Sequence, residues 1–126
     1  KELAYIHAEG FAAGELKHGP IALIEAGQPV FVIVPSPRES AELHKKVVSN
    51  IQEIRARGAR TLVIAEDGDE DVVPFADEVI RVPATLPLLM PLLTIVPLQI
   101  FAMALATAKG LDVDQPRNLA KSVTVE

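Results

Sequence analysis

Two β-branched apolar runs, separated by one helix-length segment, restrict the fold of this chain more than any other feature. The runs are PVFVIVP, residues 29–35, and RTLVIAE, residues 60–66. Continuous apolar runs of this length are typical of strands covered on both faces of a parallel sheet. The segment between them, residues 38–58, repeats apolar residues at helical spacing and ends on Gly58, where a helix is expected to stop. The order predicts an α/β fold, a parallel sheet flanked by helices on both faces in three layers.

The remaining elements extend this order in both directions. EVIRVP, residues 78–83, predicts a third strand after an acidic loop, and residues 83–109 predict a long final helix. Apolar residues at spacings of three and four predict a first helix over residues 1–13, with no capping residue before it. Three strands are few for such a sheet. We therefore expect a single domain that is a piece of a longer protein, with the rest of the sheet or a partner domain outside it.

The composition excludes several classes of partner. A formal net charge of -5 with no basic stripe makes nucleic acid an unsuitable partner. The chain contains no cysteine, which excludes disulfides and thiolate metal sites and is compatible with a reducing compartment. No secretory signal pattern occurs at the start. These observations predict a cytoplasmic protein.

One uncharged stretch, residues 83–108, is long enough to cross a bilayer, which takes about 20 apolar residues. Three prolines and scattered polar residues interrupt it. A buried helix of a soluble α/β domain, entered through proline-rich turns, explains the same residues. We therefore expect no membrane association.

Phosphate-binding and metal-binding motifs are absent from the sequence. Neither GxGxxG nor GxxxxGK occurs, so a dinucleotide cofactor is not expected. Apart from His7 and Glu9, the histidines His7, His18 and His44 have no partner at metal-ligand spacing. His7 and Glu9 would point in different directions around the expected helix. The spacing thus predicts neither a cofactor nor a metal site.

Three residue types suggest chemistry, each with a structural alternative. Glu2 and Glu9 project from one side of the expected first helix, either for acid–base work or as a solvated face. His18, in the turn sequence HGP, is suited to proton transfer or to capping nearby carbonyls. Lys121, in a short apolar tail, becomes a Schiff-base nucleophile if desolvation lowers its pKa, and is otherwise a solvated lysine.

Two blocks carry a resemblance to a known family. YIHAEGFAAGELKHGP near the start and DVDQPRNLAKSVTVE at the end closely resemble the carboxyl-terminal half of the glutamine:fructose-6-phosphate aminotransferases, or glucosamine-6-phosphate synthases. The resemblance implies the second of two sugar isomerase (SIS) domains, preceded in the full protein by a glutaminase domain and the first SIS domain. It implies a flavodoxin-like fold and a homodimer, and residues 110–126 would be an active-site tail.

The resemblance also implies roles for three residues. Glu2 in KEL resembles the base that moves a proton between C1 and C2 of the sugar. His18 in LKHGP resembles the histidine that opens the sugar ring in the active site of the neighbouring subunit. Lys121 in NLAKS resembles the lysine that forms a Schiff base with the open-chain ketose. The implied reaction converts fructose 6-phosphate and glutamine to glucosamine 6-phosphate and glutamate without a metal or organic cofactor.

The family pattern is incomplete in this chain. The serine- and threonine-rich loop that binds the sugar phosphate belongs to the first SIS domain and does not occur here. We therefore expect the isolated chain to be inactive. Two other classes remain open: a related sugar-phosphate isomerase or deglycase on the same fold, and a non-catalytic sugar-phosphate-sensing module.

Overall fold

The computed structural model describes residues 1–117, which form two compact units. We call Phe11–Thr94 the sheet unit, and Lys1–Gly10 together with residues 95–117 the terminal unit. Each unit is described by itself. The prediction that Lys121 acts in the tail falls outside the described residues.

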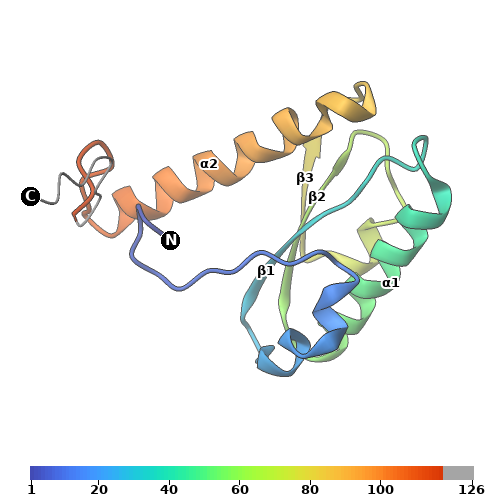
Figure 1. The fold of residues 1–126 in the computed structure, drawn as a ribbon, viewed down its shortest axis with the longest axis horizontal. Helices are drawn as coiled ribbons and strands as arrows, with labels where there is room; N and C mark the ends of the chain where they lie inside the picture. The colour runs from blue at the N-terminus through green and yellow to red at the C-terminus, as the bar shows by residue number, and fades with distance from the viewer. Residues whose placement is uncertain (118–126) are drawn as a thin grey trace, which may run out of the picture. The chain divides into compact units, whose positions relative to one another are not determined.

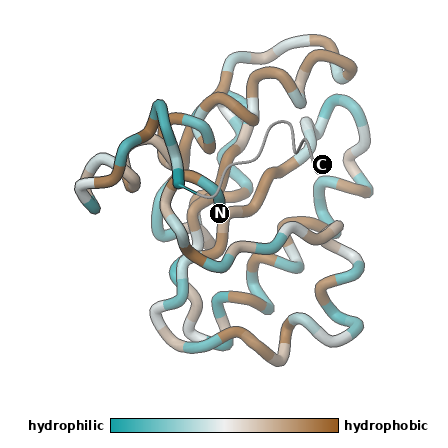
Figure 2. Tube along the Cα trace, turned by 60° about the vertical axis from the view of Figure 1, so that its left-hand side comes forward, coloured by the Kyte–Doolittle hydropathy of each residue, from teal (hydrophilic) through white to brown (hydrophobic). Residues whose placement is uncertain are grey.

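The sheet unit is built on three parallel strands in the order β1-β2-β3 (Figure 1). The strands are β1 (Pro29–Ile33), β2 (Arg60–Glu66) and β3 (Glu78–Val82). Val32 pairs with Val63 between the first two strands, and Ile64 pairs with Ile80 between the last two. The predicted parallel sheet is confirmed. Figure 2 colours the chain by hydropathy and shows apolar segments in brown alternating with hydrophilic segments in teal.

Helix α1 (Ala41–Ala56) connects β1 to β2 and covers one face of the sheet (Figure 1). Its first turn is capped by Ser40, whose hydroxyl accepts a hydrogen bond from the Leu43 N–H at 3.2 Å. Ile51 of α1 and Val63 of β2 are both 0% exposed and belong to one apolar core. Each fully buried aliphatic side chain of this kind contributes about 1.5–3 kcal/mol to folding.

The loop between β2 and β3 is attached to β2 by polar contacts. It contains a short 3-10 helix, η3 (Val73–Phe75). The buried Thr61 hydroxyl donates to the Phe75 carbonyl at 3.0 Å, and its backbone N–H donates to the Asp77 carboxylate at 2.7 Å. The Thr61 hydroxyl also lies 3.0 Å from the Asp77 carboxylate. The backbone N–H and then the hydroxyl of Thr61 hold the pKa of Asp77 below its ordinary value, because both favour the ionised carboxylate.

The predicted first helix over residues 1–13 is wrong. The structure has a turn over residues 2–5, an extended segment, and then two 3-10 helices, η1 (Glu15–His18) and η2 (Pro20–Leu23). Tyr5 has a φ of 50°, in the left-handed region that interrupts a right-handed helix. The predicted apolar stripe is poorly buried, as Ile6, one of its residues, is 41% exposed. A short helix without a packing partner is only marginally stable.

The final helix begins later than predicted and is not buried. Residues 83–86 are extended, η4 (Pro87–Leu89) follows, and α2 runs over Met90–Ala108. Met90, Thr94 and Ala106 are buried, but Leu92 is 65% exposed and Ile100 is 56% exposed. By length and composition alone, Pro87–Ala108 is long and apolar enough to cross a membrane. One such helix is weak evidence for a membrane span. The expectation of a buried helix is therefore wrong for the chain as described.

Coverage of the sheet is also less complete than predicted. β2 is the central strand, with Ile64 at 0% exposure, whereas Ile33 at the end of β1 is 47% exposed. Coverage on both faces is the expectation for residues 29–35 and 60–66. It applies to β2 and not to β1, where Val32 is buried but Ile33, which points to the opposite face, is exposed.

Candidate functional site

The structure places two of the three predicted site residues in different units. Glu2 is exposed in the turn over residues 2–5 of the terminal unit. His18 is exposed at the end of η1 in the sheet unit. Lys121 lies outside the described residues. Their roles in a common site therefore stay predictions.

Contacts within the terminal unit join its first residues to the segment after α2. The Lys109 ammonium donates a hydrogen bond to the Ala4 carbonyl, and the Arg117 backbone N–H donates to the Tyr5 hydroxyl. The Arg117 guanidinium also lies 4.4 Å from the centre of the Tyr5 ring, a cation–π contact. The turn that carries Glu2 thus lies beside Lys109, which follows α2, and beside Arg117 of the predicted tail.

The segment before His18 is anchored to α1. Lys17 forms an ion pair with Glu53 of α1 at 2.7 Å, and the Asn50 side-chain amide donates to the Ala13 carbonyl at 3.2 Å. Gly19, with a φ of 141°, follows at a conformation that other residues rarely adopt. The histidine is consequently presented on the surface by a turn attached at two points, as the HGP sequence predicts.

A second polar region lies at the carboxyl ends of the strands, the edge where open parallel sheets bind their ligands. Glu66, the last residue of β2, is buried and pairs with Arg38 at 2.9 Å. Burial acts to raise the pKa of Glu66, but hydrogen bonds from Arg38 and Ser36 outweigh it and leave the pKa below its ordinary value. The Glu66 carboxylate is therefore ionised and held in place at neutral pH.

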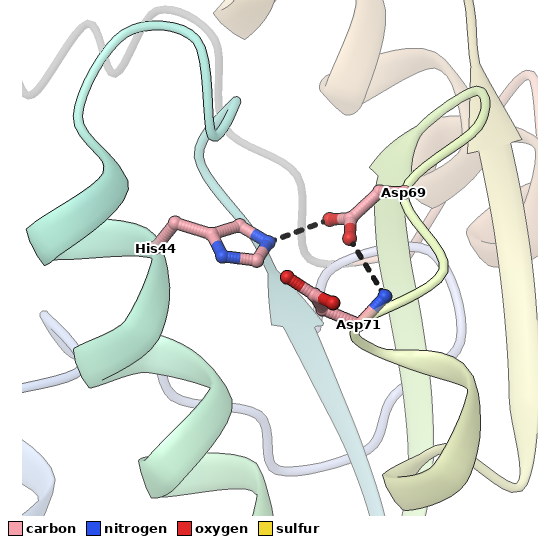
Figure 3. Close-up of side chains that lie close together, drawn as sticks. All are labelled: His44, Asp69 and Asp71. Carbon is pink, nitrogen blue, oxygen red and sulfur yellow. Dashed lines mark hydrogen bonds and ion pairs between the residues drawn. The ribbon is translucent and has the colours of Figure 1, made fainter.

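Three side chains gather beside this edge: His44 from α1, and Asp69 and Asp71 from the loop after β2 (Figure 3). The His44 Nε2 atom lies 2.8 Å from Asp69 Oδ2, and the Asp71 backbone N–H donates to Asp69 Oδ1 at 3.2 Å. One donor atom from each of the three side chains lies within 4.8 Å of the others. His44 and Asp69 are buried, whereas Asp71 is exposed.

Sequence spacing misses this cluster because its members come from two elements, 25 residues apart. A combined signal was nevertheless present. His44 sits in the first turns of the helix that follows one strand, and the aspartates follow the next strand. Since the carboxyl ends of parallel strands lie at one edge, the predicted topology alone brings these segments together.

An α/β domain with a parallel sheet and polar groups at the carboxyl ends of its strands is the class that the geometry defines. A model of the SIS domain matches residues 1–109. The chain belongs to the SIS domain family.

The most informative relatives carry one name. The glutamine–fructose-6-phosphate aminotransferase (isomerizing) of Leifsonia xyli subsp. xyli is 82% identical over all 126 residues, and that of Streptomyces coelicolor is 75% identical over the same length. Each match covers 100% of this chain and 20% of the relative, so the chain spans about a fifth of their length. The resemblance read from the two sequence blocks is confirmed.

A solved structure agrees. The C-terminal domain of glucosamine-fructose-6-phosphate aminotransferase from Francisella tularensis superimposes with a TM-score of 0.79 at 37% identity. The match covers 90% of this chain and 31% of that one. The chain thus corresponds to part of the carboxyl-terminal, isomerase region of these aminotransferases.

Proposed function

We propose that this chain is the second sugar isomerase domain of an enzyme that makes glucosamine 6-phosphate and glutamate from fructose 6-phosphate and glutamine. The observation that carries the proposal is the 82% identity to such an aminotransferase over the whole chain. The block NLAKS and the block LKHGP both lie within that match. In the longer protein, a glutaminase domain and a first SIS domain would supply the ammonia and the phosphate-binding loop.

The proposed chemistry divides between two ends of the chain. The Lys121 amine adds to the C2 carbonyl of the open-chain ketose and loses water to give an imine. Ammonia then displaces the lysine amine at C2. Glu2 removes a proton from C1 and returns it to C2, which leaves an aldehyde at C1 and an amine at C2. A carboxylate in this role typically contributes a factor of about 10²–10⁴ to the rate.

The terminal unit offers support for a shared site of Glu2 and Lys121. Tyr5, three residues after Glu2, contacts Arg117, four residues before Lys121. Four residues span at most about 14 Å. The contact between Tyr5 and Arg117 therefore supports a site in which Glu2 and Lys121 act on one small sugar phosphate.

The test uses the full-length enzyme and its Lys121→Arg and Glu2→Gln variants. Borohydride with fructose 6-phosphate should reduce the imine and label the wild type at Lys121. Lys121→Arg should lose both labelling and synthesis, since a guanidinium forms no imine under these conditions. Glu2→Gln should keep the label and lose isomerisation. Labelling at a different lysine, or an active arginine variant, would refute the assignment.

His18 is proposed to act in the active site of a second subunit of a cytoplasmic homodimer. Full-length variants lacking His18 or Lys121 are each expected to be inactive. After mixing and subunit exchange, partial activity should return, because one hybrid site holds both groups. Failure to recover activity despite demonstrated exchange would place both residues in one subunit, and sedimentation of the enzyme with membranes would contradict the location.

A further inference from the structure

The cluster of His44, Asp69 and Asp71 (Figure 3) has no part in the proposed reaction. We propose that these three side chains bind a divalent transition-metal ion, of which Zn²⁺ and Mn²⁺ are the best suited. The ligands would be the imidazole of His44 and one oxygen from each carboxylate, with water at the remaining positions.

The donor atoms are already close to the spacing that an ion requires. Ligand atoms about 2.0–2.2 Å from one Zn²⁺ ion lie about 3–4 Å from each other. In the structure, one donor atom of each residue lies within 4.8 Å of the other two, and His44 Nε2 lies 2.8 Å from Asp69 Oδ2. Small side-chain movements would therefore place all three around one ion. Ligation through Nε2 needs the neutral imidazole with its proton on Nδ1 instead of on Nε2.

Hydrogen bonds to its backbone hold the buried Asp69 in place. Its N–H donates to the Glu66 carbonyl at 3.1 Å, and its carbonyl accepts a hydrogen bond from the Arg81 guanidinium at 2.6 Å. The remaining carboxylate oxygen accepts from the Asp71 N–H. Groups that orient the ligands in this way tune metal affinity strongly, and their loss typically weakens it 10–100-fold.

A cavity of about 320 Å³ lies beside the cluster, and both His44 and Asp71 line it. Asp71 is exposed and Asp69 is buried, so the three ligands lead from the surface toward the interior. The cavity gives an ion and its water ligands a route to the site, which a metal site requires.

The surrounding charge favours a cation. Residues 67–71 carry four carboxylates in five positions. Two cationic side chains oppose them: Lys45 lines the same cavity, and Arg81 is paired with Glu70 at 3.2 Å. The acidic groups outnumber the basic ones around the cluster.

A purely structural role explains part of the arrangement. A buried His44–Asp69 pair would fasten the loop to α1 without any ion. The exposed Asp71 carboxylate is not part of that pair, and its position next to the pair supplies a third donor group. An imidazole ligand also disfavours Mg²⁺ and Ca²⁺, which prefer oxygen ligands.

The exposed position of Asp71 allows a test that leaves the fold intact. Co²⁺, Zn²⁺ and Mg²⁺ are titrated into the full-length protein, its Asp71→Asn variant and an Asp67→Asn variant. Asp67 is exposed in the same loop and lies outside the cluster, so both variants lose one carboxylate of similar position. Binding is followed by the visible absorption of Co²⁺ and by competition with Zn²⁺.

We expect wild type and Asp67→Asn to bind Zn²⁺ alike and Mg²⁺ much more weakly. Asp71→Asn should lose at least about 100-fold in Zn²⁺ affinity, since a direct ligand matters no less than its supporting groups. Equal Zn²⁺ affinity in all three proteins, or no binding above that of a variant lacking His44, overturns the proposal. Asp71→Asn and Asp67→Asn should keep the wild-type circular dichroism spectrum, and Asp71→Asn should keep synthase activity.

Discussion

The sheet unit and the terminal unit are held together in different ways. In the sheet unit, Ile51, Val63 and Ile64 are 0% exposed and lie in the interior around β2. In the described part of the terminal unit, the buried residues are two alanines, Ala4 and Ala106. The first unit has a core of its own, whereas the second relies on a few polar contacts between its ends. The unit that carries Glu2 therefore has less buried apolar core of its own than the sheet unit.

The strongest test of this contrast replaces one isoleucine in each unit. Ile51→Ala in the sheet unit should lower the free energy of unfolding of the 126-residue chain by about 2–5 kcal/mol, since it leaves a cavity in a filled core. Ile100→Ala on α2 should change it by less than about 0.5 kcal/mol, because that side chain is 56% exposed. Urea denaturation gives both values, and similar losses at both positions would show that α2 is packed within this chain.

A glycine comparison gives a smaller expected effect. Gly58 has a φ of 85°, and a Cβ there would lie 3.1 Å from Ala26. Gly58→Ala should therefore cost about 1–2 kcal/mol in unfolding free energy. Gly10, in the terminal unit, has no atom within 4 Å of an added Cβ, and Gly10→Ala should be neutral or slightly stabilising. Thermal unfolding of the two variants separates these outcomes, and an equal melting temperature would count against the close approach at Gly58.

The smallest expected effect concerns the stability of the folded chain at acidic pH. The pKa of Asp77 is lowered in the folded chain by its hydrogen bonds from Thr61, so its contribution to stability is present above the unfolded pKa. That contribution is lost as the pH falls through the lower, folded pKa, below about pH 4. Unfolding measured from pH 7 to pH 2 should show a shallower loss in Asp77→Asn than in wild type. Parallel curves for the two proteins would mean that Asp77 titrates alike in the folded and unfolded states.

Local pattern predicts the sheet unit well. The predicted strand over residues 60–66 matches β2, and the predicted helix over 38–58 contains α1. These elements pack on each other, so local preference and tertiary contact agree. The same apolar periodicity fails over residues 1–13, where the contacts that would stabilise a helix do not occur in the described chain. It also predicts burial of α2 from composition, although hydrophobicity alone does not say what covers a helix.

Prediction of the sites follows a similar division. The HGP sequence correctly predicts an exposed histidine at a turn, because turn chemistry is local. The roles of Glu2, His18 and Lys121 come from family resemblance and need segments outside this chain. The cluster around His44 is missed because it depends on which strands are neighbours, which spacing along the chain does not contain.

The contact between Tyr5 and Arg117 also bears on how the protein is made. The two residues are 112 positions apart, and the ribosome adds about 5–20 residues per second. Tyr5 is therefore synthesised roughly 6–22 s before Arg117. The strands and α1 have their neighbours much sooner, so proteolysis of ribosome-bound chains stalled just before Arg117 should find the sheet protected and the first ten residues of this chain cut. The turn bearing Glu2 can therefore be completed only after Arg117 has been synthesised.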